Sequence, residues 1–91
     1  MKTTAEIRMR ERARLGNTIR AWRAYKEWSQ EGLGNLISMH QSNLSEIEGG
    51  LVQASDDTID KLAKAFDIAP MDLVRCVNPP TKKRESAKVK G

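Results

Sequence analysis

The segment from 30 to 48 constrains the fold of this 91-residue chain most strongly, because it fits two short helices joined by a tight turn. Apolar side chains recur at helical spacing on both sides of the turn, with Leu33 and Ile37 before it and Leu44 and Ile47 after it. Two helices of this length can bury these side chains only against each other and against further helices. The segment therefore predicts a helix-turn-helix within an all-α domain.

Residues in and beside the predicted turn meet the other demands of such a junction. Gly34 is small where the two helices would approach closely, and Ser38 falls where the backbone needs an unusual angle. Met39 is apolar and can plug the turn from inside. The polar side chains left on the outer side of the second helix are His40, Gln41, Ser42, Ser45 and Glu46. A short helix with such a face is suited to reading base edges in a DNA groove.

Helical signals continue on both sides of this segment, and no stretch shows the apolar–polar alternation of a strand. Positions 5–27 are rich in helix formers, and the apolar spacing predicts a buried helical face over 15–27. Later helices are expected over about 55–66 and from residue 70 onward. The capping or stop residues expected at the helix boundaries are Ser29, Gly49, Gly50, Ser55 and Pro70. We therefore predict a compact five-helix domain.

Basic residues concentrate at the two ends of the chain. Residues 1–14 carry five basic and two acidic side chains, and residues 75–91 carry six basic and one acidic side chain. In contrast, residues 15–74 carry five basic and nine acidic side chains. We expect one domain over 15–77, preceded over 1–14 by a basic N-terminal arm or helix extension and followed over 78–91 by a flexible basic tail. Such arms attract phosphate, although a purely solubilising role is an equal alternative.

The remaining composition narrows the class of protein. The length allows one domain at most, and the single cysteine, Cys76, cannot form an internal disulfide. No apolar run approaches a membrane span and no signal core is present, so we expect a cytoplasmic protein. There is no Cys/His set with ligand spacing, no glycine-rich phosphate loop and no nucleophile beside a base. We therefore expect no metal, no cofactor and no enzymatic activity.

Several short motifs carry a family resemblance over about residues 15–74. They are Ile19 through Arg23, Ser29-Gln30-Glu31, Ser42 through Gly50, and Thr58 through Phe66 followed by a short final helix. With these motifs the chain resembles the Cro/repressor-type (XRE-like) helix-turn-helix family. The resemblance implies a lambda-repressor-like DNA-binding domain with its motif at 29–48, and a dimer that binds a palindromic operator and regulates transcription. It also implies a prokaryotic or phage-encoded protein.

The resemblance assigns roles to individual residues. Base contacts are expected from the outer face of the recognition helix at about 40–48, namely His40, Gln41, Ser42, Ser45 and Glu46. A phosphate contact is expected from Gln30, at the start of the first motif helix, and another from Asn43. Because the loop after the recognition helix lacks Lys or Arg, further phosphate contacts are expected from Arg20, Lys82, Lys83 and Arg84. Arg23 and Glu48 stand where related repressors form a buried ion pair. Ser38 replaces the usual turn glycine, which implies some backbone strain.

Two hypotheses about partners follow. In the first, a homodimer forms through the apolar residues of the C-terminal helix region, which are Met71, Leu73, Val74 and Val77. In the second, the chain is an antitoxin or another protein-interaction module that neutralises a toxin, because the same fold serves such proteins. A toxin gene beside this gene would favour the second hypothesis.

Overall fold

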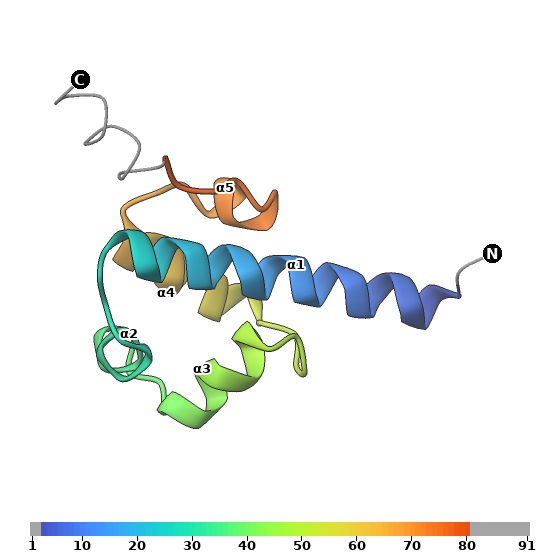
Figure 1. Cartoon of the computed structure of the whole chain (residues 1–91), viewed down its shortest axis with the longest axis horizontal. Coiled ribbons are helices and arrows are strands. Elements are labelled where there is room, and N and C mark those ends of the chain that lie inside the picture. Colours follow the sequence, from blue (N-terminus) through green and yellow to red (C-terminus); the bar gives the residue numbers. More distant parts are fainter. Residues whose placement is uncertain (1–2, 81–91) are drawn as a thin grey trace, which may run out of the picture.

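The computed structural model describes residues 3–80, so the predicted roles of the tail over 81–91 lie outside the described residues. The described part of the chain contains helices and no strand, as predicted. In chain order the helices are α1 (Thr4–Tyr25), α2 (Gln30–Leu36), α3 (Gln41–Glu48), α4 (Asp56–Phe66) and α5 (Pro70–Val74), as labelled in Figure 1. No helix among residues 3–80 has the length and apolar character needed to cross a membrane.

The first helix begins much earlier than the buried face predicted over 15–27. Thr3 and Glu6 form a capping box, in which the Glu6 backbone N–H donates to Thr3 Oγ1 at 3.2 Å and the Thr3 backbone N–H donates to Glu6 Oε1 at 2.9 Å. Residues 4–14 are therefore a helical extension and not a flexible arm. The helix runs through Gly16 without a break.

Gly16 marks the point where α1 crosses the end of α3. A Cβ atom added at Gly16 would lie 2.7 Å from the carbonyl oxygen of Ile47, closer than side chains tolerate. Only glycine lets the two backbones approach to this distance. The crossing fixes α1 across the carboxyl end of α3, and Figure 1 shows the N-terminal half of α1 continuing past the other helices.

The helices end in a recurrent way, with a residue in the left-handed region just after the last turn. Such residues follow α1, α2, α4 and α5 at Glu27, Ser38, Asp67 and Cys76, with φ angles of 61°, 56°, 62° and 59°. After α3 the left-handed residue is Gly50, with φ of 76°. Glycine is the residue that usually adopts this conformation. Because Glu27 turns the chain, α1 ends at Tyr25, two residues before the end of the predicted range 15–27.

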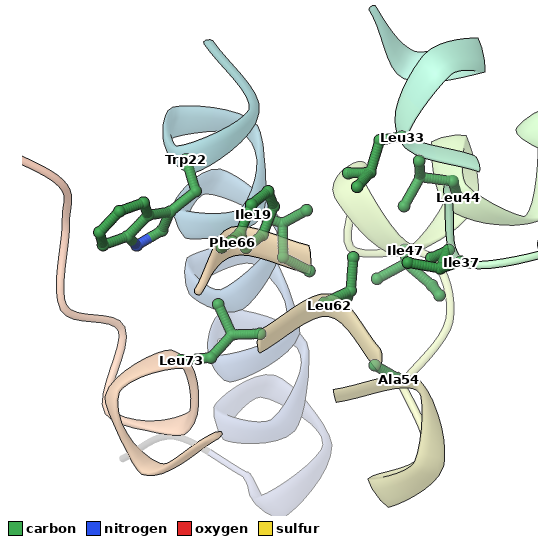
Figure 2. Close-up of a cluster of buried hydrophobic side chains, with 10 residues drawn as sticks. All are labelled: Ile19, Trp22, Leu33, Ile37, Leu44, Ile47, Ala54, Leu62, Phe66 and Leu73. Atoms are coloured by element: carbon green, nitrogen blue, oxygen red, sulfur yellow. The ribbon is translucent and has the colours of Figure 1, made fainter. Parts of the chain in front are cut away.

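One hydrophobic core joins all five helices. Figure 2 shows its members, which come from all five helices and from the segments after α2 and before α4: Ile19, Trp22, Leu33, Ile37, Leu44, Ile47, Ala54, Leu62, Phe66 and Leu73. Trp22 and Trp28 both stack on Phe66, with ring centroids 6.0 Å apart in each pair. Both tryptophans are therefore packing residues.

The C-terminal helix is fixed to this core by Leu73 and by the segment that follows it. Leu73 is fully buried, and Trp22 Nε1 donates a hydrogen bond to the Val77 carbonyl at 2.8 Å. The prediction that Leu73 contacts a second subunit is therefore wrong, because its side chain is already enclosed within its own domain. Met71, Val74 and Val77 remain exposed on the outer side of this region.

Candidate nucleic-acid interface

The turn between α2 and α3 is built by backbone geometry. Ser29 caps α2, accepting a hydrogen bond from the Gly32 N–H at 2.9 Å. At the other end, Ser38 takes the left-handed conformation and the Met39 N–H donates to the Gly34 carbonyl at 2.8 Å. A Cβ atom at Gly34 would lie 2.7 Å from the carbonyl oxygen of Met39. The expected roles of Gly34 and Ser38 in this turn are confirmed.

This turn leaves α3 with one buried side and one exposed side. Leu44 and Ile47 point into the core, and Glu48 is only 2% exposed. The opposite side is entirely polar, and each of its side chains is exposed: His40, Gln41, Ser42, Asn43, Ser45 and Glu46. A helix of this length with its first turns exposed can enter the major groove of DNA and bring these side chains to base edges.

His40 is the N-cap of α3 and not its first helical residue. Its Nδ1 accepts a hydrogen bond from the Ser42 N–H at 3.2 Å and lies 2.9 Å from the Ser42 hydroxyl. Because Nδ1 acts as an acceptor, this network assigns the proton of a neutral ring to Nε2. His40 thus caps the helix with one nitrogen and keeps an outward N–H donor on the other.

A continuous chain of polar contacts connects the core to the exposed face of α3. The guanidinium of Arg23 donates two hydrogen bonds to the Glu48 carboxylate, at 2.9 and 3.0 Å. Gln30 Nε2 donates to Glu48 Oε1 at 3.1 Å, and Gln41 Nε2 donates to Gln30 Oε1 at 3.2 Å. The chain therefore runs from a buried ion pair to a side chain at the start of α3.

The buried carboxylate sets the direction of this chain. An ionised carboxylate only accepts hydrogen bonds, so the amide NH₂ of Gln30 faces Glu48 and its oxygen faces Gln41. Gln41 must then present its own NH₂ to Gln30. Its second N–H and its carbonyl oxygen make no hydrogen bond within residues 3–80. Adenine offers a matching acceptor and donor in the major groove.

The residues expected to contact DNA phosphates differ in how many contacts they already make within the protein. Asn43 is exposed on α3. Arg20 has a half-exposed side chain that donates to the Glu48 carbonyl at 3.3 Å, and its Nε lies 3.8 Å from Glu48 Oε1. Gln30 is half-buried between its two partners. Three further candidates, Lys82, Lys83 and Arg84, lie outside the described residues.

Residues 14–75, which hold both helices of this surface, match a sequence model described as a helix-turn-helix domain. The chain belongs to the XRE-type helix-turn-helix family of DNA-binding transcription regulators. Members of this family are transcription regulators and not enzymes.

Several known proteins are similar to this helix-turn-helix protein in sequence or in structure. It is 36% identical over 61 residues to the control protein C.BamHI of Bacillus amyloliquefaciens, a match that spans 66% of this chain and 75% of that protein. The crystal structure of the restriction-modification controller protein C.AhdI from Aeromonas hydrophila superposes with a TM-score of 0.68 at 34% identity, covering 70% of this chain and 97% of that one. The crystal structure of the hypothetical transcription factor NHTF from Neisseria superposes with a TM-score of 0.66 at 28% identity, covering 84% of this chain and 83% of that one.

Sequence reasoning missed the contacts that link functional residues of this helix-turn-helix protein to one another. Gln30 was expected to act on phosphate alone, yet it bridges Glu48 and Gln41. Arg12 was not singled out, and its Nε donates to the Gly50 carbonyl at 3.3 Å, next to the end of α3. No local pattern signals these contacts, because their partners are far apart in the chain and meet only where the helices cross.

Proposed function

We propose that this regulator binds a two-fold symmetric DNA operator as a dimer and reads its sequence with the first turns of α3. The observation that carries this proposal is the exposed polar side of α3, set directly behind a fully packed apolar side. One such helix contacts only a few base pairs. Two copies about 34 Å apart along the duplex would double the site, which is how helix-turn-helix dimers gain selectivity.

Discrimination among bases is assigned to five side chains of this surface. Gln41 would bond adenine through its free N–H and oxygen, and Glu46 would accept from the amino group of cytosine. His40 would donate from Nε2 to an acceptor on a base or a phosphate. Ser42 and Ser45, exposed on successive turns of the helix, would add single hydrogen bonds.

Phosphate contacts would fix the register of α3 without reading sequence. Arg20, Asn43 and Gln30 flank the exposed surface and are the candidates within the described residues. The basic residues Lys82, Lys83 and Arg84 would add attraction to phosphate that depends on ionic strength.

The dimer is proposed to form through the exposed apolar residues around α5. Met71 is 56% exposed, Val74 is 53% exposed and Val77 is 44% exposed, and the first two lie on one face of α5. Leu73 takes no part, since it packs inward. A two-fold axis beside α5 would bring the same patch of both copies together.

The likeness to the control protein C.BamHI and to the restriction-modification controller protein C.AhdI supports a narrower role. This bacterial or phage-encoded regulator would control genes of a restriction-modification system. The competing hypothesis of an antitoxin predicts a stable one-to-one complex with a toxin encoded nearby, and no observation on this molecule favours it.

The test is selection of bound duplexes from a random pool by the full chain at physiological salt. A two-fold symmetric consensus with half-sites about one helical turn apart is the expected result. A half-site without a symmetric mate would contradict dimeric binding, and enrichment of no sequence would contradict the proposed function as a whole.

A further inference from the structure

A groove of about 700 Å³ lies on the side of the molecule where the N-terminal half of α1 passes α5 and the loop between α3 and α4. One of its walls comes from the helical extension of α1, whose lining residues Arg8, Glu11 and Arg12 lie before the residues 14–75 that match the family. Figure 1 shows this part of α1 projecting beyond the other helices. The helical extension of α1 therefore forms one side of the groove.

The lining of the groove combines two kinds of chemistry. Its charged side chains are Arg8, Arg12, Arg14 and Arg75, against one carboxylate from Glu11. Within residues 3–80, no hydrogen bond or salt bridge engages the side chains of Arg8, Arg14 or Arg75. The groove thus offers free guanidinium groups, which favour an acidic ligand.

The apolar part of the lining is partly exposed. Val52 is 40% exposed and Val74 is 53% exposed, while Leu15 and Ile59 beneath them pack on the core. Val74 also belongs to the face of α5 assigned above to the dimer. An apolar floor with a basic rim fits a protein surface better than a phosphate backbone, because protein–protein interfaces have apolar centres and polar rims.

The same chain carries a surface of the opposite charge. Residues 55–72, which span α4 and most of α5, contain five aspartates and only two lysines. Asp56, Asp57, Asp60 and Asp67 are all exposed. In a two-fold dimer, a contact between two different patches occurs twice. The basic patch of each copy can therefore meet the acidic patch of the other copy, and both contacts favour the dimer.

We infer that the groove is occupied by a second copy of this chain, with the basic α1 extension of each copy lying against the acidic α4–α5 surface of the other. Val52 and Val74 would be buried at the centre of the contact. This inference rests on the dimer proposed above and adds the extension of α1 as a second element that holds the two copies together.

The inference is tested without DNA, by measuring the dimer dissociation constant of the full chain by analytical ultracentrifugation. The double variant Arg8→Glu with Arg14→Glu reverses two charges on the groove, and Arg10→Glu is a control that reverses one charge on the same exposed extension, outside the groove. We expect the double variant to raise the dissociation constant at least about tenfold and the control to change it less than about threefold. Added salt should weaken the wild-type dimer.

A second readout uses Cys76, which lines the groove and is partly exposed. Its alkylation by a maleimide should slow as wild-type protein is concentrated, and should stay fast in the double variant. Unchanged dimerisation of the double variant would overturn the inference. If dimerisation were unchanged but DNA binding were weaker, the arginines would be assigned to contacts with DNA phosphates. If both were unchanged, the remaining occupant of the groove would be a different protein.

The dimerisation measurements test the groove contact independently of the proposed DNA-binding function. The duplex selection can fail while the two charge variants still differ in dimerisation. Conversely, a wild-type chain that stays monomeric at every concentration tested overturns the groove contact, even where duplex selection returns a half-site.

Discussion

The guanidinium of Arg23 and the carboxylate of Glu48 form a two-pronged ion pair that joins α1 to the end of α3, with hydrogen bonds of 2.9 and 3.0 Å. Glu48 is almost fully buried, and Arg23 also donates to the Trp28 carbonyl at 3.2 Å. Through Gln30 the same carboxylate reaches Gln41 on the exposed side of α3. One pair of residues thus braces the helix crossing and orients a side chain assigned to base recognition.

Breaking this pair should be costly because it leaves a buried charge without its partner. We expect Arg23→Met to lower the free energy of unfolding by about 3–5 kcal/mol. Arg20→Met, which removes a half-exposed arginine near the same carboxylate, should cost less than about 1 kcal/mol. Urea denaturation followed by circular dichroism measures both. A double variant carrying Arg23→Met and Glu48→Met should be more stable than Arg23→Met alone, and equal stability would argue against an uncompensated charge as the cause.

Gln41 and Asn43 are neighbours on α3 with different assigned roles. Gln41→Ala should relax the preference at one base pair of each half-site, at a cost of about 1–3 kcal/mol for the preferred sequence. Asn43→Ala should weaken binding to all sequences to a similar extent. Titration of both variants against operator duplexes substituted at single positions separates the two patterns. Uniform weakening by Gln41→Ala would contradict base reading by this residue.

Two glycines of the seven-residue helix α2 should respond to alanine in opposite ways. At Gly34 the new methyl group would meet the Met39 carbonyl at 2.7 Å, so Gly34→Ala should destabilise the domain by about 1–3 kcal/mol. At Gly32 it would meet only the Ser29 hydroxyl, at 3.1 Å, and this capping side chain has to give by only a few tenths of an ångström. Gly32→Ala should therefore stabilise the domain by about 0.5–1 kcal/mol, because alanine favours helix. Thermal unfolding of both variants measures the difference, and a shift of the same sign in both would contradict this reasoning.

Ser38 holds a left-handed conformation that glycine adopts without steric cost. Ser38→Gly should therefore stabilise the domain by about 1 kcal/mol, which raises Tm by roughly 4–8 °C in a domain of this size. The same chemical change at Ser45, inside α3, should lower stability by a few tenths of a kcal/mol. Differential scanning calorimetry compares the two variants. A lower Tm for Ser38→Gly would mean that the serine side chain stabilises the turn more than its backbone strain costs.

The basic residues after Asn78 should affect DNA binding through ionic strength. Replacing Lys82, Lys83 and Arg84 together with alanine should weaken binding to every duplex and reduce the slope of log K against log salt by up to about 0.9 for each lost phosphate contact. Fluorescence anisotropy at several salt concentrations gives this slope. The same slope as the wild-type chain would remove the tail from the list of phosphate ligands.

The sequence by itself determined the features that depend on local spacing. The apolar positions at 33, 37, 44 and 47 predicted the two helices of the motif and their buried sides. Caps at Ser29 and Ser55 and the proline at the start of α5 followed from the preferences of single residues. These preferences act within one turn of helix, so they can be read without knowing the rest of the fold.

Only the tertiary structure decided how these pieces meet. The crossing of α1 and α3 at Gly16 brings Arg23 to Glu48 and lets Gln30 connect that pair to Gln41, across separations that no sequence pattern encodes. Only the tertiary structure showed that Leu73 faces inward. A five-residue helix is too short for the spacing of its apolar residues to mark the buried face. The physical reason is the same in each case: packing of whole helices, and not the preference of any residue, sets which side chains come within reach of one another.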